Sequence, residues 1–347
     1  MTNHWFQKPC IEPDTSFANK AQEHQLTLTK PAGSLGMLEQ IAISYCAWQK
    51  TLTPQCNKIQ VSVFAADHGV CAQGVSAFPQ EVTAQMIFNF LNGGAAISVL
   101  ANSIGANMNV INMGIQSQID EAKGLVNTPL DQGTKDITKE AAMSEETMHR
   151  ALTLGKQQHT DSSLHLFIGG DMGIGNTTSA SCIYSALLDL PPEITVGPGT
   201  GIDQNGIQRK QQAVQHALQL HTQEINSPLD VLQRVGGLEI AGLVGAYIAS
   251  AQQQIPVLVD GFIATAAALL ATRINPSSRE WMMFAHRSAE PAHQHALEAL
   301  QATPMLDLGM RLGEGSGAGV AVSIIQNALT LHKQMATFSN ANISESV

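Results

Sequence analysis

The stretch LHLFIGGDMGIGNTTSASCIYSALL, residues 164–188, joins a strand pattern to a helix pattern through a glycine-rich turn. Residues 164–168 form a short apolar run, and residues 181–188 have a helical pattern. Glycines between them let the backbone approach a ligand closely, and a helix N-terminus with hydroxyl groups attracts an anion. The acidic Asp171 in the same turn indicates that a cation, or a group that must lose a proton, lies nearby.

Four other short apolar runs repeat the strand pattern, at 61–66, 108–114, 255–261 and 281–286. Longer helical patterns separate them, such as 144–158, whose first turn Ser144 would cap. Strands that alternate with helices predict an α/β fold with a mostly parallel sheet covered on both faces. The polar segment 115–141 is expected to be a long loop near the edge of this sheet.

The composition limits the classes of partner. The 347 residues allow one large α/β domain or two smaller ones, and only 13% of them are charged, against roughly 25% in an average protein. This low fraction predicts extensive buried surface and is compatible with a subunit interface. Because the net charge is -10, we expect no long-range attraction to nucleic acid or to anionic lipid. An anionic substrate would therefore need a local pocket of hydrogen-bond donors.

The cysteines and the N-terminus predict a location in the cytoplasm. Five cysteines are scattered along the chain without a CxxC pair, which is typical of reduced thiols inside the cell. The N-terminal residues lack an apolar signal core. The longest apolar runs fall well short of the ~20 residues of a membrane span, so no span is expected.

Polar or glycine-rich turns follow four of the five predicted strands. They are Asp67-His68-Gly69, Gly169-Gly170-Asp171, Asp260-Gly261 and His286-Arg287-Ser288. In an α/β sheet, ligands bind beyond the carboxyl ends of the strands, so these turns would meet at one rim. Ordinary turn chemistry also explains aspartate and glycine at such positions. The added histidine, arginine and serine favour a pocket without identifying its ligand.

The stretch GPGTGIDQNGIQRK, residues 197–210, combines a glycine-rich turn with Lys210 in a predicted helix. Gly201 and Thr200 belong to this turn. The pattern suggests a phosphate site, although neither a Walker motif nor a GxGxxG fingerprint is present. The alternative is a surface loop followed by a helix that carries Lys210 on its solvated face.

The stretch MRLGEGSGAGVAV, residues 310–322, places Glu314 between glycines just before an apolar helix. One interpretation is an ordinary residue of a helix start, stabilised by the helix dipole. The other is a lone carboxylate folded over an apolar pocket, where a raised pKa would suit a general base near neutral pH.

The stretch 74–101 brings Ser76, Phe78 and Gln85 to a helix start. Val82, Met86 and Phe90 share one face of that helix, and the simple interpretation of such apolar residues is a protein core. The histidines form no HExxH and no pairing with cysteines, so a metal site is not expected, and no GxSxG is present.

Taken together, these stretches identify a family. They are LTKPAGSLGMLEQIA, AADHGV, GVSAFPQEVTAQM, GGAAISVLA, GDMGIGNTTSA, GPGTGID, VDGFIATAAALL, HRSAEPAH and LDLGMRLGEGSGA, in this order. From about Leu28 to the final helix, the chain closely resembles the nicotinate-nucleotide–dimethylbenzimidazole phosphoribosyltransferases of cobalamin biosynthesis. One departure concerns the usual Gly-Glu-Met-Gly-Ile-Gly-Asn-Thr-Thr motif, whose acidic residue here is Asp171, one methylene shorter.

The resemblance implies a reaction and an architecture. The phosphoribosyl group of nicotinate mononucleotide passes to 5,6-dimethylbenzimidazole, which gives nicotinate and α-ribazole 5′-phosphate with inversion at the ribose C1′. Neither a coenzyme nor a metal takes part, and the protein is expected to be a homodimer. A large Rossmann-like α/β domain would span residues 56–304. A small helical domain would combine residues 1–55 and 305–347, with Val320, Ile324, Leu329 and Leu331 as apolar positions of the last long helix.

The resemblance also implies residue roles. Glu314 would be the general base, and Asp171 would lie near the positive charge that develops at C1′. The acceptor base would bind beside Ser76, Phe78, Gln85 and Leu312. The phosphoribose would be held by Gly175, Asn176, Thr177, Gly201, Lys210 and Ser288, with Lys210 also counted as catalytic.

Two alternatives stay open. The same donor reacts in related enzymes with adenine, with other benzimidazoles or with phenols, so the resemblance fixes the reaction type more closely than the acceptor. A non-catalytic nucleotide-binding protein on the same scaffold is the other alternative, although such a protein would not need a base at position 314.

Overall fold

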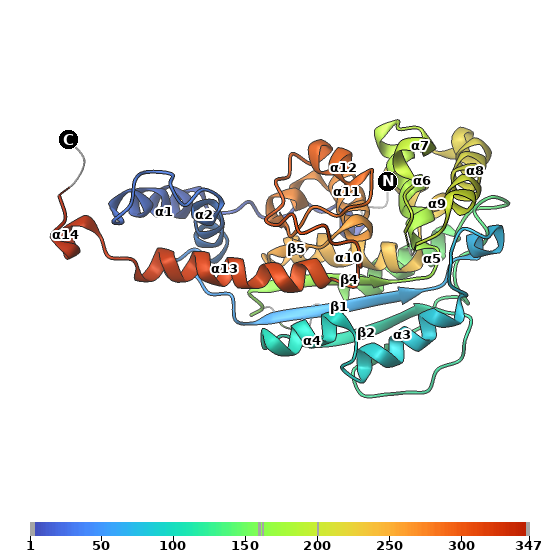
Figure 1. Cartoon of the computed structure of the whole chain (residues 1–347), viewed down its shortest axis with the longest axis horizontal. Helices are drawn as coiled ribbons and strands as arrows, with labels where there is room; N and C mark the ends of the chain where they lie inside the picture. The colour runs from blue at the N-terminus through green and yellow to red at the C-terminus, as the bar shows by residue number, and fades with distance from the viewer. Residues whose placement is uncertain (1–3, 159–160, 162, 200, 345–347) are drawn as a thin grey trace.

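The computed structural model describes residues 4–158, 161, 163–199 and 201–344. Within them, six parallel strands form one sheet in the order β3-β2-β1-β4-β5-β6 (Figure 1). The strands are β1 (Ile59–Ala66), β2 (Asn107–Gly114), β3 (Leu125–Asn127), β4 (Leu166–Met172), β5 (Val257–Val259) and β6 (Met282–Phe284). This is the strand order of the Rossmann fold, and the predicted fold class is confirmed.

The helices connect and cover the strands. They are α1 (Thr15–Thr27), α2 (Met37–Gln49), α3 (Glu81–Leu91), α4 (Ala96–Ser103), α5 (Glu145–Lys156), α6 (Asn176–Leu188), α7 (Pro192–Thr195), α8 (Gln204–His221), α9 (Pro228–Val235), α10 (Leu238–Gln252), α11 (Phe262–Ile274), α12 (His293–Ala299), α13 (Ser316–Gln334) and α14 (Phe338–Ala341). Short 3-10 turns are η1 (Trp5–Gln7), η2 (Gly69–Gln73), η3 (Thr222–Glu224) and η4 (Pro276–Trp281). As predicted, Ser144 caps α5, because its side chain accepts a hydrogen bond from the N–H of Thr147.

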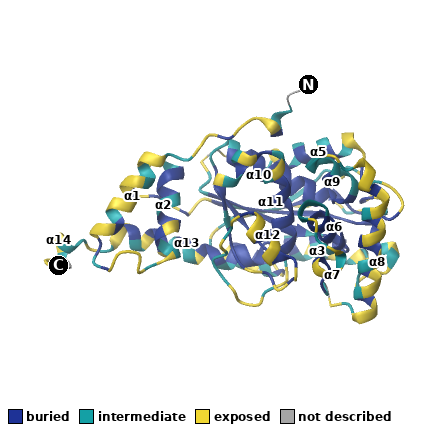
Figure 2. Ribbon diagram, turned by 90° about the horizontal axis from the view of Figure 1, so that it is seen from above, coloured by how far each residue is buried: buried dark blue, intermediate teal, exposed yellow. Residues whose placement is uncertain are grey.

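Each face of the sheet has its own apolar core because side chains alternate along a strand. Phe64 and Phe167 point to the face covered by α10 and α11, whose residues are almost all buried (Figure 2). Val63 and Ile168 point to the other face, where α3, α4 and α13 pack. The near-continuous burial of β1 and β4 is typical of parallel strands that are covered on both sides.

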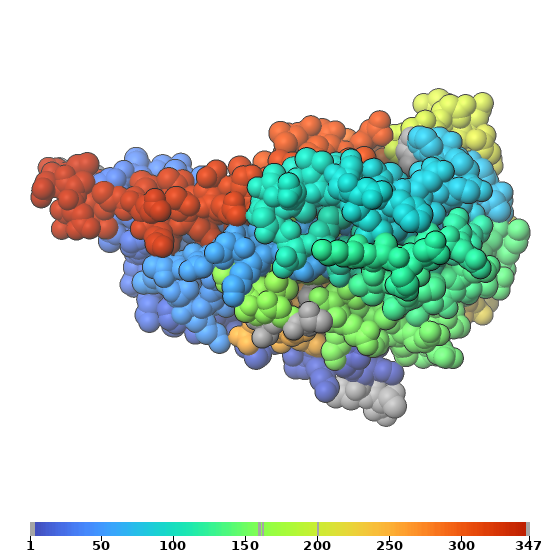
Figure 3. Space-filling model, turned by 90° about the horizontal axis from the view of Figure 1, so that it is seen from below, coloured from blue at the N-terminus to red at the C-terminus, as the bar shows by residue number. Residues whose placement is uncertain are grey.

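The N-terminal and C-terminal helices lie together at one narrow end of the molecule. There α1 packs on α2, and α2 packs on the C-terminal half of α13 (Figure 3). The N-terminal half of α13 instead lies on α4 and β4. The expected apolar positions Val320, Ile324 and Leu331 are only partly buried. The buried stripe is offset, with Val322, Ile325, Leu329 and His332 among its members, since α13 faces the sheet and α2 at once. The division into domains at residues 55/56 and 304/305 stays a prediction.

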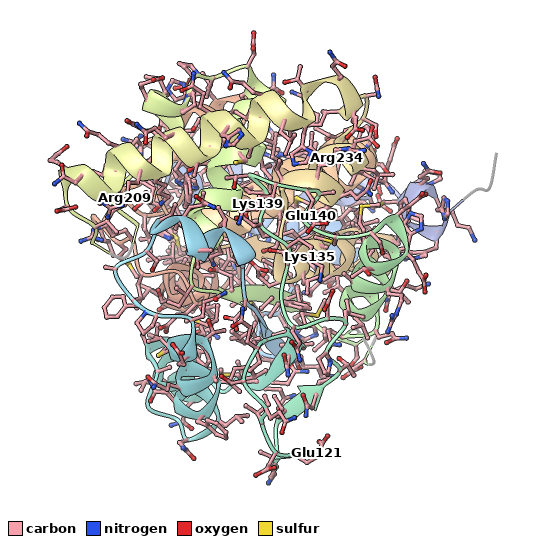
Figure 4. All side chains as sticks on the ribbon, turned by 90° about the vertical axis from the view of Figure 1, so that its right-hand side faces the viewer. Glu121, Lys135, Lys139, Glu140, Arg209 and Arg234 are labelled. Carbon is pink, nitrogen blue, oxygen red and sulfur yellow. The ribbon has the colours of Figure 1, made fainter. Side chains whose placement is uncertain are left out.

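The segment 115–141, expected to be a loop, contains the short edge strand β3. The remainder runs along the rim of the sheet, where the N–H of Gly69 donates to the carbonyl of Thr134 at 3.1 Å. Figure 4 shows Glu121 at the outer tip of this segment, whereas Lys135, Lys139 and Glu140 lie nearer the body of the protein. The prediction missed β3 because its three residues are half-buried and lie among polar neighbours.

By length and hydropathy alone, residues Glu81–Ser103 resemble a membrane span. In the structure this stretch comprises α3 and α4, separated by a turn, and 39% of its most apolar part is buried. Core helices of globular proteins meet the same criterion, so the stretch carries no argument for a membrane.

Candidate active site

A cavity of about 490 Å³ opens at the carboxyl ends of β4, β5 and β6. Parallel strands bring their C-terminal turns to one rim, which is where α/β sheets bind ligands. The lining residues are Phe78, Val82, Met86, Asp171, Met172, Gly173, Ile174, Asn176, Thr177, Gly199, Gly261, Phe262, Ile263, His286, Ser288, Glu290, Arg311, Leu312, Gly313 and Glu314. A wider hollow of about 790 Å³ runs along α5, away from these strand ends.

Glu314 lies in the turn that leads into α13, in a left-handed conformation with φ of 66°. The turn rests on β4 at Gly170, where any Cβ would collide with the carbonyl oxygen of Glu314. The Glu314 carboxylate accepts hydrogen bonds from the N–H groups of Ile97 and Ala96 at the start of α4, while its Oε2 has no partner. Burial raises the pKa of Glu314, and these N–H groups oppose the rise. Glu314 is therefore a buried carboxyl group whose pKa is shifted towards neutrality, with one free oxygen.

Asp260 holds the same turn through hydrogen bonds to its backbone. It follows β5, is fully buried, and accepts hydrogen bonds from the N–H of Gly315 at 3.2 Å and of Ala318 at 2.8 Å. A carboxylate at this position also complements the dipole of α13. The Nε2 of His286 lies 3.7 Å from Oδ1 of Asp260. The two groups tie the start of α13, and with it Glu314, to the ends of β5 and β6.

Asp171 lies at the end of β4 and accepts a hydrogen bond from the side-chain amide of Asn176 at 3.0 Å. Burial raises the pKa of Asp171 well above its usual range, and the negative charges of Asp260 and Glu239 add to this rise. Burial thus favours the protonated form of Asp171, and a cation in the cavity would favour the ionised carboxylate.

Lys210 is buried behind the cavity with only 1% of its surface exposed, so the alternative of a solvated lysine is wrong. Its Nζ donates to Oγ1 of Thr177 at 2.6 Å and to the carbonyl of Gly197 at 3.4 Å. Burial lowers the pKa of Lys210 to about 8. Thr177 and Ser288 line the cavity, whereas Lys210 does not line it and lies behind Thr177.

The opposite wall of the cavity is apolar. Phe78, Val82 and Met86 come from α3 and the residues before it, and Leu312 from the segment before Glu314. Phe78 and Leu312 are half exposed or more, at 50% and 59%, which leaves their surfaces available to a ligand. Val82 and Met86 are half-buried, and Met86 packs against the core as expected, but both also line the cavity.

Other predicted site residues lie beside the cavity without lining it. Ser76 accepts a hydrogen bond from the N–H of Phe78 at 3.2 Å, and Gln85 is exposed on α3. Gly175 packs against Cys71 and His68, and the residue of this turn that lines the cavity is Gly173. Gly201 adopts φ of 101° outside the lining, and Thr200 falls outside the described residues. Sequence alone does not say which glycine of a turn faces the ligand.

Glu290 and Arg311 line the cavity but were not predicted as site residues. Both stand in stretches that the sequence had marked, HRSAEPAH and LDLGMRLGEGSGA. Both side chains are held by the backbone of Gly199: Glu290 accepts a hydrogen bond from the N–H of Gly199, and Arg311 donates to the carbonyl of Gly199. Among the described residues, no group of three or more His, Cys, Asp or Glu residues is placed to hold a metal ion.

Comparisons with known proteins agree with this geometry. A family model described as phosphoribosyltransferase matches residues 10–343. Nicotinate-nucleotide–dimethylbenzimidazole phosphoribosyltransferases from Pseudomonas aeruginosa and Pseudomonas syringae are 47% and 48% identical, over 99% of this chain and of theirs. A crystal structure of the enzyme of that name from Thermus thermophilus superposes with a TM-score of 0.91 at 40% identity, and covers 96% of this chain and 100% of its own.

Similarity of this extent includes the turn after β4, the Lys210 segment and the Glu314 turn, which the fold gathers around one cavity. The chain therefore belongs to the family of nicotinate-nucleotide–dimethylbenzimidazole phosphoribosyltransferases.

Proposed function

We propose that this protein transfers the phosphoribosyl group of nicotinate mononucleotide to 5,6-dimethylbenzimidazole, with nicotinate and α-ribazole 5′-phosphate as products. One observation carries the proposal. The cavity is lined by a buried carboxyl group with a free oxygen, Glu314, by apolar side chains, and by Thr177, whose hydroxyl accepts a hydrogen bond from the buried Lys210 behind it. An aromatic azole fits the carboxyl group with the apolar side chains, and a phosphate monoester fits the hydroxyl group with the lysine behind it.

The donor phosphate would bind beside Thr177 and Ser288, with Lys210 behind them. Thr177 lies in the first turn of α6, so the positive end of that helix dipole would also attract the anion. A charge-assisted hydrogen bond to such an anion is worth about 1.5–3 kcal/mol. The acceptor ring would lie against Phe78, Met86 and Leu312, where burial of its apolar surface contributes further binding energy.

The chemical step is a displacement at the ribose C1′. The bond from C1′ to the pyridinium nitrogen breaks, and its electron pair stays on that nitrogen, so nicotinate leaves without protonation. The lone pair of one ring nitrogen of the acceptor forms the new bond to C1′ from the opposite face, which inverts the centre. The other ring nitrogen loses its hydrogen to Glu314. Because water has little access to Glu314, its raised pKa makes it a stronger base than an exposed glutamate.

Binding of the donor would change the ionisation of Asp171. The pyridinium carries a positive charge, and an opposite charge nearby favours the ionised carboxylate. Donor binding would therefore release the proton that the buried Asp171 tends to hold, and the resulting charge would stabilise the positive charge that develops at C1′.

The direct test is turnover. Purified protein with nicotinate mononucleotide and 5,6-dimethylbenzimidazole should release nicotinate and form the α-linked nucleotide, both of which can be followed by chromatography. Absence of nicotinate release with this acceptor, and with adenine, other benzimidazoles and phenols, would refute the proposed reaction.

Two alternatives are separated by the same assay. If the acceptor differs, mixed-acceptor experiments will rank the compounds by kcat/KM, which is the measure of specificity. If the protein only binds the nucleotide, calorimetry will detect nicotinate mononucleotide without turnover. The free Glu314 oxygen favours catalysis over simple binding, since a binding protein gains nothing from a buried, partly unsatisfied carboxyl group.

We also propose that the protein is a cytoplasmic homodimer with two domains, residues 56–304 and the joined segments 1–55 and 305–347. Exposed apolar side chains support an interface, among them Phe88 of α3 and Val99 of α4, two helices that cover the same face of the sheet. All five cysteines are free, which is consistent with a reducing compartment. Sedimentation equilibrium would distinguish a dimer from a monomer.

A further inference from the structure

The turn Gly197-Pro198-Gly199 lies between the cavity, which Gly199 lines, and the buried Lys210. Gly199 has φ of 51°, and a Cβ on it would lie 3.2 Å from the Nζ of Lys210 and 2.9 Å from Oγ1 of Thr177. The turn therefore covers the buried ammonium group closely. Its shape decides how the positive charge of Lys210 is presented to a ligand in the cavity.

Glu290 fixes this turn from the segment that follows β6. Its Oε1 accepts a hydrogen bond from the N–H of Gly199 at 3.1 Å, and its Oε2 lies against Gly197, where any Cβ would collide with it. Only 5% of Glu290 is exposed, and Oε2 has no hydrogen-bond partner. Arg311 donates to the carbonyl of the same Gly199 at 3.0 Å. The two side chains thus hold both backbone polar groups of one residue.

The charge of Glu290 acts on Lys210 as well. A buried lysine tends to lose its proton, and the negative charge of Glu290 is the largest influence that opposes this loss. The other titratable group that acts on Lys210 is Cys182 of α6, whose pKa burial raises to about 12, so it stays neutral at physiological pH. Burial raises the pKa of Glu290, and the charge of Lys210, the N–H of Gly199 and the charge of Arg311 oppose this rise. Of the two groups that favour the charged form of Lys210, Glu290 has the larger effect.

We propose that Glu290 is a positioning residue of the donor-phosphate site, which shapes the Gly197–Gly199 turn that covers Lys210. The proposal rests on the function proposed above, in which Lys210 lies behind the phosphate site. The phosphate would contact the hydroxyl groups of the cavity wall and be attracted by the charge of Lys210 behind them. The acidic Glu290, which would repel a phosphate in direct contact, acts through the turn and through Lys210.

Sulfate binding tests the proposal without turnover, because the charge of sulfate does not change over the pH range that matters. The sulfate dissociation constant is measured by calorimetry from pH 6.5 to 9.5 for the wild type and for Glu290→Gln. Wild-type affinity should fall above a midpoint near pH 8, where Lys210 loses its proton. In Glu290→Gln the midpoint should move down by about one pH unit, since the glutamine keeps the hydrogen bond to Gly199 but not the charge.

Glu298→Gln is the matched control, because it removes one negative charge from the exposed face of the helix that follows, and its midpoint should not move. Hydrogen exchange of the 197–203 peptide reports on the turn, and Glu290→Ala should exchange faster than Glu290→Gln. If Glu290→Gln fails to fold, Glu290→Asp replaces it and should keep the wild-type midpoint while losing protection at Gly199.

Two results would overturn the proposal. One is that the pH midpoint of sulfate affinity in Glu290→Gln equals that of the wild type. If sulfate also bound more tightly at every pH, Glu290 would be a group that repels the anion and not one that positions its site. The other is the absence of sulfate binding to the wild type, which would remove the phosphate site itself. Neither result depends on nicotinate release, so a failure of this proposal is distinguishable from a failure of the proposed reaction.

Discussion

Replacement of Glu314 by glutamine tests the role of Glu314 as a general base separately from its role in the structure. Glutamine has nearly the same shape and keeps one oxygen to accept the N–H groups of Ile97 and Ala96, so α4 and the turn before α13 should persist. The change removes only the ability of the side chain to take a proton. General base catalysis is worth about 10²–10⁴-fold, which corresponds to about 3–5 kcal/mol in the activation free energy.

The structure favours a loss of at least about 100-fold in kcat. Asp171 is another carboxyl group on the cavity wall, but its Oδ2 already accepts a hydrogen bond from Asn176, and in the proposed reaction its charge faces C1′ of the donor, so it is a poor replacement base. Because Lys210, Thr177 and Ser288 are unaffected, the KM for nicotinate mononucleotide should stay within about twofold.

The assay is initial-rate nicotinate release at saturating donor, with Glu298→Gln as the control for loss of one negative charge. The melting temperature of Glu314→Gln at pH 8 should not fall, because a neutral side chain avoids the cost of a buried charge. A kcat within fivefold of the wild type, in a correctly folded variant, would remove Glu314 from the role of base.

Four further outcomes are expected. Gly170→Ala should displace the Glu314 turn and lower kcat, with an overpacking cost of about 1–3 kcal/mol visible in chemical denaturation; an unchanged kcat would contradict the close packing. Lys210→Met should raise the KM for the donor about 10–100-fold and leave acceptor binding intact in a calorimetric titration. The pH profile of kcat/KM should be bell-shaped, rising as Glu314 loses its proton above pH 4.5 and falling near pH 8 as Lys210 loses its own. Because folding raises the pKa of Asp171, the contribution of Asp171 to stability is lost as the pH rises from 3.8 towards its pKa in the folded protein. Asp171→Asn avoids this loss and should gain stability relative to the wild type between pH 5 and 8, by about 1.4 kcal/mol for each unit of raised pKa. A difference in unfolding free energy between the two proteins that is the same at pH 5 and at pH 8 would contradict this.

The sequence predicted the sheet because its strands are short apolar runs between longer helical patterns. Five of the six strands fall where the runs at 61–66, 108–114, 164–170, 255–261 and 281–286 placed them. The edge strand β3 escaped prediction, since an edge strand of three half-buried residues needs no apolar run. The offset of the buried stripe on α13 has a similar cause, because one helix contacts both the sheet and α2.

Parts of the site were predictable because parallel strands end on one rim. Asp171, Asn176, Thr177, Ser288 and Glu314 all reach the cavity from turns that the sequence had marked. Contacts that depend on a distant backbone group were not predictable. The Glu314 carboxylate binds the start of α4, more than two hundred residues earlier in the chain, and no local pattern encodes that contact.

The same limit applies to Glu290, whose partner is a single N–H group in another turn. The same limit explains why the sequence pointed to Gly175, whereas Gly173 is the glycine that lines the cavity. Both glycines fit the motif, and only the three-dimensional path of the turn decides which one faces the cavity.

Helix α13 is a single rod of 19 residues that starts directly after the Glu314 turn and whose last turns pack against α1 and α2. At 1.5 Å per residue the rod is about 28 Å long, so a tilt of about 5° at the far end moves the near end by about 2.5 Å. A misplacement of about 1 Å in a reacting group costs about 10²-fold in rate. A change in how the terminal helices pack on the far end of α13 would therefore displace Glu314 and change the reaction rate. Substitutions at that remote contact could adjust the rate without altering any group that the substrates touch.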